Sequence, residues 1–518
     1  MLACLILLAC AQQAAASPVW TGYPDQEAVR YDVTLSADFA ARTLSGVAHI
    51  TLQARVALDA LRFDLDSGKG WHVDFAAADG ADLREIFGEH QVVVPLARSL
   101  PAGASVTVTA RLSGVPVDGL EFVESRYGET FLVADPFGTR TRGWLPCEDF
   151  VGDRAAWRLE LTVPRAMEAI GAGEWREARA DAATRTFVGE TRADIPPTLF
   201  AFAAGPWQRV AEDGDARLLP HFVYSEDVEA ARLGLGRHAA WMKTMESTFG
   251  PYLWEKFTTA QVPTRWGGVE YPGNVWLAES LYDHGDHGVD TLAHEFTHMW
   301  FGDGVGYAQW EHAWLSEGFA SYFGPWLHEQ AGGLPLRSAM SGARQAWRRD
   351  TRARRRPVIW KEYPFPDDLF MSSSSNTYQK GAWVLHMLRD EVGEVAFFGG
   401  IAAWYQAHRG TAVTTDTLRA AMEAAAGRDL GWFFAQWLAQ PNCPLLRVTP
   451  TASGVTIAQE QPGEPYLFPL TLAWKDDQGQ SQRARIRVEG ASADVEIAPG
   501  WRDLVLDPDV VLLFDQPR

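Results

Sequence analysis

Cysteine is scarce in this chain of 518 residues, and its placement limits what disulfides can contribute. Two of the four cysteines, Cys4 and Cys10, lie within the first ten residues, while Cys147 and Cys443 are far apart in sequence. Such spacing is not the framework that holds small secreted domains together. We expect Cys147 and Cys443 to be two separate buried thiols, although spacing alone neither requires nor excludes one bridge between them.

Positive charge is also in short supply. Lys and Arg total 46 residues against 66 Asp and Glu, which gives a formal net charge of -20 at pH 7. A surface this acidic repels a phosphate backbone, so no nucleic-acid partner is expected. The one basic run, residues 344–356, is interpreted as a solvated helix face, with recognition of an acidic substrate as the alternative.

Long hydrophobic runs are missing apart from the N-terminus, and no later segment resembles a membrane span. Residues 1–17 are an apolar run followed by small residues, which is typical of a secretory signal, although no Lys or Arg precedes the run. LLAC at 7–10 resembles a bacterial lipobox and predicts a lipid anchor at Cys10, whereas AAA at 14–16 suits ordinary cleavage before Ser17. Both interpretations predict export, to the bacterial periplasm or as a membrane-anchored lipoprotein.

The chain is longer than one hydrophobic core usually serves, so several domains are expected. Residues 18–208 alternate apolar and polar positions in short runs, which predicts an antiparallel β-sheet domain, either a sandwich or a saddle. Residues 209–442 are mostly helical in spacing, including a helix predicted over 228–249, and alternation returns over 443–518. The predicted fold is therefore multidomain α+β, with a helical middle domain and a small C-terminal β-sandwich.

Chemistry is concentrated in residues 291–323. His294 and His298 are four residues apart and share one helix face, where two imidazoles can ligate one zinc at roughly 2.0–2.1 Å each. Glu295 stands beside the first imidazole, where a carboxylate can take a proton from a water activated by the metal. A catalytic zinc usually has three protein ligands, and Glu317, with eighteen residues between it and His298, is the natural third.

The alternative is a pair of packed helix-surface histidines, because composition alone would produce a HExxH string in roughly one such chain in a hundred. The motif follows Asp290 and Thr291, which predict a helix N-cap region, and its helix carries Leu292, Phe296 and Trp300. A polar cluster on a helix this apolar is costly to bury unless it has partners. The sequence therefore favours a metal site.

HEFTHMWFGD at 294–303 followed by WLSEGFASYF at 314–323 resembles the M1 family of zinc aminopeptidases. The resemblance implies that His294, His298 and Glu317 bind one Zn²⁺ per chain and that Glu295 is the general base. It also implies a thermolysin-like fold for the helical domain.

Further segments extend the resemblance over most of the chain. RGWLPCED at 142–149 is similar to the family's Arg-x-x-Phe-Pro-Cys-x-Asp segment, and 376–385 resembles the segment with its catalytic tyrosine. Tyr378 would then stabilise the oxyanion of the tetrahedral intermediate. The terminal strands resemble the small third domain, and no large helical domain follows them. We expect the short bacterial form of the family, with an active site more open to solvent.

Exopeptidase action needs a group that binds a free α-ammonium, which the family supplies with the Glu of a Gly-x-Met-Glu-Asn motif. Here the matching run is GGVEY at 267–271, which keeps the glutamate but departs at the third and fifth positions. The resemblance implies that Glu270 binds the substrate's amine, with Gly267 and Gly268 beside the substrate. Asp135 lies near where the family's sheet domain supplies a second amine-binding side chain, and it is carried over to that role.

The predicted function is therefore zinc-dependent hydrolysis of the N-terminal residue from peptides with a free N-terminus. Two alternatives remain open. One is a catalytically silent binding protein of the same fold, which zinc content and hydrolysis of an aminoacyl anilide would distinguish. The other is a zinc endopeptidase in which Glu270 is a structural acid, and this is separated by comparing free with N-acetylated peptides.

Overall fold

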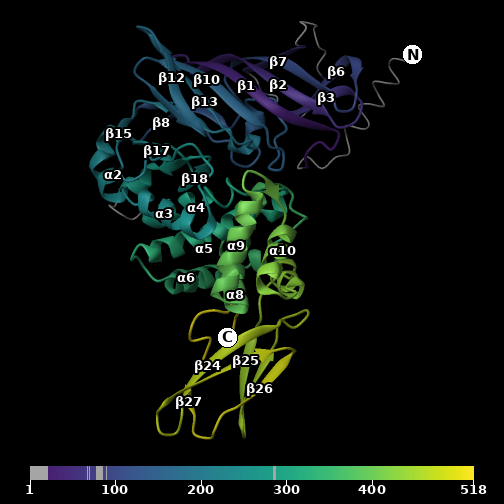
Figure 1. Cartoon of the computed structure of the whole chain (residues 1–518), viewed down its shortest axis with the longest axis vertical. Coiled ribbons are helices and arrows are strands. Elements are labelled where there is room, and N and C mark those ends of the chain that lie inside the picture. Colours follow the sequence, from purple (N-terminus) through teal and green to yellow (C-terminus); the bar gives the residue numbers. More distant parts are fainter. Residues whose placement is uncertain are drawn as a thin grey trace.

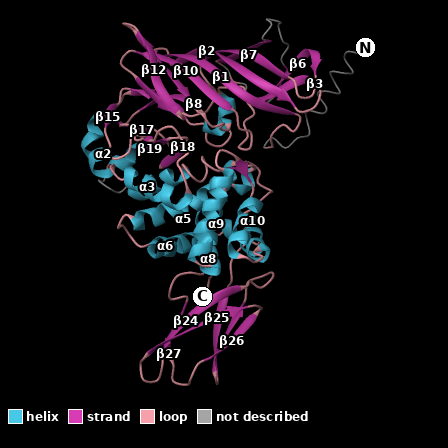
Figure 2. Cartoon of the chain, viewed as in Figure 1, coloured by secondary structure: helices cyan, strands magenta, loops and turns pink. Residues whose placement is uncertain are grey.

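The computed structural model describes residues 21–66, 68, 70–77, 86–88, 90–283 and 288–517, so the predicted leader with Cys4 and Cys10 lies outside the described residues. Three parts follow one another along the longest axis: a β-sheet domain, a mostly helical domain and a small β domain (Figures 1 and 2). In the part of the chain that the structure describes, no helix has the length and apolarity needed to cross a membrane.

The described residues of the N-terminal domain form fourteen strands, which are β1 (Gln26–Asp38), β2 (Thr43–Ala54), β3 (Leu58–Asp64), β4 (Trp71–Ala77), β5 (Ile86–Phe87), β6 (Gln91–Leu100), β7 (Ser105–Gly114), β8 (Leu120–Glu124), β9 (Thr130–Ala134), β10 (Ala156–Pro164), β11 (Glu168–Gly171), β12 (Glu174–Ala180), β13 (Thr184–Glu190) and β14 (Phe202–Gly205). Seven form a large sheet in the order β12-β13-β10-β1-β2-β7-β4, in which only β1 and β10 are parallel. Smaller sheets have the orders β11-β14-β9-β8 and β3-β6-β5.

Alternation along the strands explains this sheet. In β1, Tyr31, Val33 and Leu35 are fully buried, while Thr34 and Ser36 between and after them are exposed. Successive side chains of a strand point to opposite faces, so one face packs on the core and the other meets solvent.

The middle domain begins with a five-stranded sheet in the order β15-β16-β17-β19-β18. Its strands are β15 (Gln208–Val210), β16 (His221–Val223), β17 (Thr258–Val262), β18 (Gly268–Tyr271) and β19 (Asn274–Ala278), and β20 (Gly306–Tyr307) pairs separately with β21 (Ala412–Val413). Its helices are α2 (Val228–Gly234), α3 (His238–Phe249), α4 (Val289–His298), α5 (Trp314–Gln330), α6 (Leu336–Arg349), α7 (Asp367–Phe370), α8 (Gly381–Val392), α9 (Glu394–His408), α10 (Thr415–Ala426) and α11 (Gly431–Phe434), with π-helical segments η7 (Asn376–Lys380) and η8 (Ala435–Ala439). Because β15 pairs with β16, this sheet starts just before the predicted domain bound at residue 209.

Two local expectations are corrected. The helix predicted over 228–249 is two helices, because the chain leaves α2 at Gly234 and passes through Gly236, whose φ of +109° is incompatible with a continuous α-helix. The helix that carries His294 and His298 begins at Val289, with Gly288 at the N-cap position, so Asp290 lies in its first turn instead of capping it.

The C-terminal domain has two three-stranded sheets, β22-β23-β26 and β25-β24-β27. The strands are β22 (Leu446–Thr451), β23 (Gly454–Gln459), β24 (Phe468–Lys475), β25 (Ser481–Val488), β26 (Ser492–Glu496) and β27 (Arg502–Leu506). The multidomain α+β fold predicted from the sequence is confirmed. The two described cysteines, Cys147 and Cys443, are both buried and free, as expected.

The basic run at 344–356 contacts this C-terminal domain. Arg344 lies 2.8 Å from the fully buried carboxylate of Asp507, and Arg354 lies 3.1 Å from Asp515. The interpretation of the run as a solvated face is therefore wrong for these residues, because long-range carboxylates that the local pattern does not reveal pair with them.

Candidate active site

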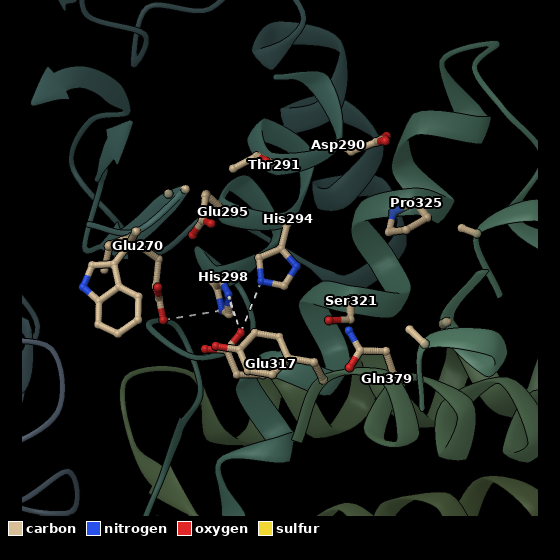
Figure 3. A pocket seen from close by; sticks show the side chains of 18 of the residues that line it. Glu270, Asp290, Thr291, His294, Glu295, His298, Glu317, Ser321, Pro325 and Gln379 are labelled. Carbon is tan, nitrogen blue, oxygen red and sulfur yellow. Dashed lines mark hydrogen bonds and ion pairs between the residues drawn. The ribbon is translucent and has the colours of Figure 1, made fainter. Parts of the chain in front are cut away.

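A cavity of about 610 Å³ lies in the middle domain, between α4, α5, α6, β18 and η7. Figure 3 shows the side chains of His294, Glu295 and Glu317 in the wall of this cavity, with Glu270 facing them from β18. All the residues predicted from the sequence to be functional except Asp135 therefore line one cavity. They come from segments more than a hundred residues apart, between Gly267 and Tyr378.

His294, His298 and Glu317 bring their ligand atoms within 4.8 Å of one another. Glu317 Oε2 lies 3.2 Å from His294 Nε2 and 3.4 Å from His298 Nε2. Ligand atoms placed tetrahedrally at zinc distances stand roughly 3.3 Å apart, so this spacing fits one Zn²⁺. Two imidazoles and one carboxylate are also a donor set that catalytic zinc sites use.

The hydrogen bonds of His298 support the same assignment. Its Nδ1 lies 3.0 Å from the carbonyl oxygen of Phe301, which can only accept, so Nδ1 carries a proton, and in the neutral imidazole that binds a metal Nε2 is the nitrogen with the lone pair. Ser316 Oγ also lies 3.0 Å from Nδ1. Among the described residues, the buried Nε2 has no hydrogen-bond partner, which is the state of an imidazole ready to bind a metal.

The turn after α4 explains why the motif continues as it does. The chain reverses at Gly302, whose φ is +123°, and a Cβ at this position would stand 2.3 Å from Ser316 Oγ and 2.8 Å from His298 Nδ1. Only glycine fits there, and its turn delivers the Phe301 carbonyl to His298.

A second group of possible ligands, Glu212, His221 and His238, lies elsewhere in the middle domain and is fully buried. Here His221 Nδ1 accepts from the backbone N–H of Thr259 at 3.3 Å, so its proton is on Nε2, which donates to Glu212 at 2.9 Å. Glu212 also lies 2.6 Å from His238 Nδ1. Its carboxylate is satisfied by hydrogen bonds, so this group is a structural cluster and differs from the His298 site in the tautomer of its histidine.

Burial and charge act on the carboxylates of the cavity in opposite ways. Burial raises the pKa of the Glu317 carboxyl, but His298 and His294 outweigh it and lower this pKa to about 2. Burial is the largest cause that raises the pKa of the Glu295 carboxyl well above its usual value, and the nearby Glu270 carboxylate is the second. Glu317 is thus held as an anion beside the imidazoles, and Glu295 is the more basic carboxylate.

Tyr378 reaches the site through η7 and a close contact between helices. A Cβ on Gly318, the residue after Glu317, would stand 2.9 Å from Gly381 Cα, so two glycines let α5 and the start of α8 touch. This contact brings the Tyr378 ring parallel to that of His294, with centroids 6.1 Å apart. Burial is the largest cause that raises the pKa of the Tyr378 phenol well above its usual value, and the Glu317 carboxylate is the second. The phenol therefore stays protonated and can donate a hydrogen bond.

Glu270 lies on β18, with Oε1 3.8 Å from His298 Nδ1. Its side chain is 9% exposed, and burial raises its pKa to about 7, partly offset by His298. Gly267 and Gly268 of the GGVEY run line the same cavity.

Asp135 differs from the expectation. It does not line the cavity, and its carboxylate accepts hydrogen bonds from Arg140, Trp266 and Tyr271. Both carboxylate oxygens of Asp135 already have donors within the protein. The amine-binding role carried over to Asp135 stays a prediction.

Several cavity residues were not predicted from the sequence. Phe137 from the sheet domain and Trp266 form an aromatic wall near Glu270, with ring centroids 5.7 Å apart. On α6, the small residues Ala339, Gly342 and Ala343 line another wall. No motif marks them, because each reaches the cavity only through packing of distant elements, although their helical spacing signals one face of α6.

Residues 235–437 match the family described as peptidase family M1 domain. Aminopeptidase N of Streptomyces lividans is 34% identical over 201 residues, which cover 35% of this chain and 23% of that protein. Leucine aminopeptidase 2 of Coccidioides immitis is 27% identical over 288 residues, which cover 52% of this chain and 44% of that protein. The chain spans less than half the length of these curated relatives.

Solved structures show the same fold. Crystal structures of an M1 zinc metallopeptidase from Deinococcus radiodurans, one of them with a bound Tyr-Ser-Ala substrate, superpose with a TM-score of 0.69 at 24% identity, covering 82% of this chain and 96% of theirs. The superposition supports the fold, and the sequence match covers the helices that carry HEFTH and Glu317. The helical middle domain of this chain belongs to peptidase family M1.

Proposed function

We propose that this protein is a zinc-dependent aminopeptidase that removes the N-terminal residue from peptides with a free α-amino group. One observation carries the proposal: a single cavity contains the three metal-ligating side chains and, facing them, the buried carboxylate of Glu270. The aminopeptidase names of the curated relatives and the Tyr-Ser-Ala substrate of the Deinococcus radiodurans protein support peptides as the substrate class. A silent binding protein would not need Glu295 and Tyr378 in the same wall.

His294, His298 and Glu317 would hold one Zn²⁺ per chain, which supplies Lewis acidity to a peptide carbonyl and to a water. Glu295 is placed to take a proton from the attacking water and to deliver it to the leaving amide nitrogen. The phenol of Tyr378 donates a hydrogen bond to the carbonyl oxygen as negative charge develops on it. Glu270 binds the substrate's ammonium and so fixes which peptide bond reaches these groups.

Gly268 sets the position of Glu295. A Cβ on Gly268 would stand 2.6 Å from Glu295 Oε1 and 2.7 Å from its Cγ, whereas a Cβ on the neighbouring Gly267 would meet nothing within 4 Å. The strand that carries Glu270 therefore lies directly against the base. A side chain at residue 268 would have to displace it.

We also propose that the chain is exported. The support is the apolar run and small residues of the leader at 1–17, with lipid attachment at Cys10 as the alternative to cleavage before Ser17. N-terminal sequencing and mass measurement of the mature protein distinguish the two, because a lipidated chain begins at Cys10 and carries added acyl mass.

Wild-type protein should contain one zinc per chain, and His298→Ala should lose both zinc and activity, because two protein ligands rarely retain a catalytic ion. Glu295→Gln is the matched control, which should keep the metal and lose most turnover. Metal content after dialysis, measured by plasma mass spectrometry, checks all three proteins. Full zinc content in His298→Ala, or two zinc ions per wild-type chain, would contradict the assignment.

Gly268→Ala should lower kcat by roughly 10²-fold, because the added methyl group displaces Glu295 and a displacement of about 1 Å costs this much. Gly267→Ala, one residue away, adds its methyl group to open space and should lose far less. Steady-state kinetics on an aminoacyl anilide compares the two variants, with melting temperature as the check on folding. Equal losses would show that Gly268 does not act through Glu295.

Tyr378→Phe should lower kcat by roughly 10²-fold or more while changing KM little, since its hydrogen bond is made mainly in the transition state. The measurement is a full saturation curve at constant zinc content. A variant in which only KM rises would make Tyr378 a binding residue.

Glu270→Ala should lose about a hundredfold in kcat/KM, roughly 2.7 kcal/mol, with zinc content unchanged. The wild-type enzyme should not cleave N-acetylated peptides, because acetylation removes the charge and leaves a buried carboxylate unpaired. Product analysis by liquid chromatography of a tripeptide and its acetylated form checks both points. Equal cleavage of the two peptides by wild type would favour the endopeptidase alternative.

A further inference from the structure

The strand that carries Glu270 has little backbone support. β18 contains four residues and stands at the edge of the middle sheet, hydrogen-bonded within that sheet only to β19. Its other edge has no strand partner in this sheet, and its residues line the cavity, so an extended peptide can add there as a further strand. A short edge strand held on one side is free to shift unless side chains anchor it.

Asp135 supplies such an anchor from the other domain. It directly follows β9 of the N-terminal domain, and its carboxylate binds two residues that flank Glu270 in sequence. Oδ1 accepts a hydrogen bond from Tyr271 Oη at 3.2 Å, and Oδ2 accepts one from Trp266 Nε1 at 3.1 Å. The carboxylate thus contacts both ends of the segment 266–271 that contains β18.

Asp135 is itself held in place. Its backbone N–H donates to the Gly119 carbonyl at 3.0 Å, and Arg140 Nη1 lies 2.7 Å from Oδ2. The side chains of Asp135 and Arg140 are only 15% and 13% exposed. Hydrogen bonds to an ionised carboxylate are roughly twice as strong as neutral ones, and burial limits competition from water.

Strand alternation explains why the contact between Asp135 and Tyr271 does not occupy the Glu270 side chain. Neighbouring side chains on a strand point to opposite faces, so Tyr271 points away from the face on which Glu270 meets the metal-site helix. Trp276 of β19 adds a parallel contact, because its Nε1 donates to the Ala134 carbonyl at 3.1 Å. The end of β9 therefore anchors the β18–β19 hairpin through residues other than Glu270. The unpaired edge of β18 is not used by these contacts.

We propose that Asp135 is a positioning residue, which fixes β18 and with it the Glu270 carboxylate through Tyr271 and Trp266. The inference rests on the proposed function, since Glu270 is taken to bind the substrate's ammonium. It replaces direct binding of the amine by Asp135, whose two carboxylate oxygens are already engaged by side chains that donate to them. It also gives a role to Tyr271, the fifth residue of the GGVEY run.

The experiment compares kcat/KM for a free tripeptide with that for its N-acetylated form in zinc-loaded full-length protein. Asp135→Ala should lower kcat/KM for the free peptide about tenfold, and Asp135→Asn and Tyr271→Phe should lower it by smaller factors. In a Glu270→Ala background, Asp135→Ala should add less than a twofold loss, because the group it positions is gone. Zinc content should stay at the wild-type value throughout.

Asp118→Asn is the matched control. Asp118 pairs with the same Arg140 at 2.6 Å but is 45% exposed, and no hydrogen bond joins it to Trp266 or Tyr271. This variant should retain wild-type kcat/KM.

Three results would overturn the inference: an equal loss in the Asp118 variant, a full tenfold loss in the Glu270→Ala background, or wild-type activity in Asp135→Ala. If Asp135→Ala does not fold, the double-mutant cycle of Tyr271→Phe with Glu270→Ala decides the same question, and additive losses refute the inference. Failure of the proposed function is separate, because it shows in wild type as equal cleavage of both peptides.

Discussion

The packing of α4 on α5 in the middle domain is the contact on which the candidate site depends. It places two imidazoles of α4 beside Glu317 of α5 in a buried space, where a charge without a partner is costly. The turn at Gly302 and the hydroxyl of Ser316 then orient His298, so that its Nε2 faces Glu317. Stability and chemistry are coupled here, because the buried side chains that would bind zinc are also those whose burial costs the most free energy without a partner of opposite charge.

The side of the cavity that carries Glu270 depends on a different contact, between domains. β18 lies between α4, which touches Gly268 through Glu295, and the end of β9, which touches Tyr271 through Asp135. The N-terminal sheet domain is therefore part of the site's architecture, and it also contributes Phe137 to the cavity wall. Arg344 and Arg354 of the middle domain pair with carboxylates of the C-terminal domain, which lies at the opposite end of the molecule from the N-terminal sheet domain (Figure 1).

Local periodicity by itself determines much of this fold. Alternation in the first and last parts predicts sheets, and helical spacing predicts the middle domain, because a half-buried strand and an amphipathic helix repeat with different periods. The predictions from the sequence are wrong where a local pattern competes with a backbone constraint or with partners from distant segments. Gly236 divides a predicted helix, and Arg344 and Arg354 pair with carboxylates of the C-terminal domain.

The spacing in HEFTH and the position of Glu317 predict the candidate zinc ligands from the sequence alone, because two of them lie one helical turn apart. GGVEY likewise indicates Glu270, through its resemblance to a family motif. Only the tertiary structure shows that Nδ1 of His298 donates a hydrogen bond whereas Nδ1 of His221 accepts one. It alone also shows that Asp135 binds Tyr271 and Trp266. Those properties depend on partners from other strands, turns and domains, in one case 136 residues away, and no local spacing encodes them.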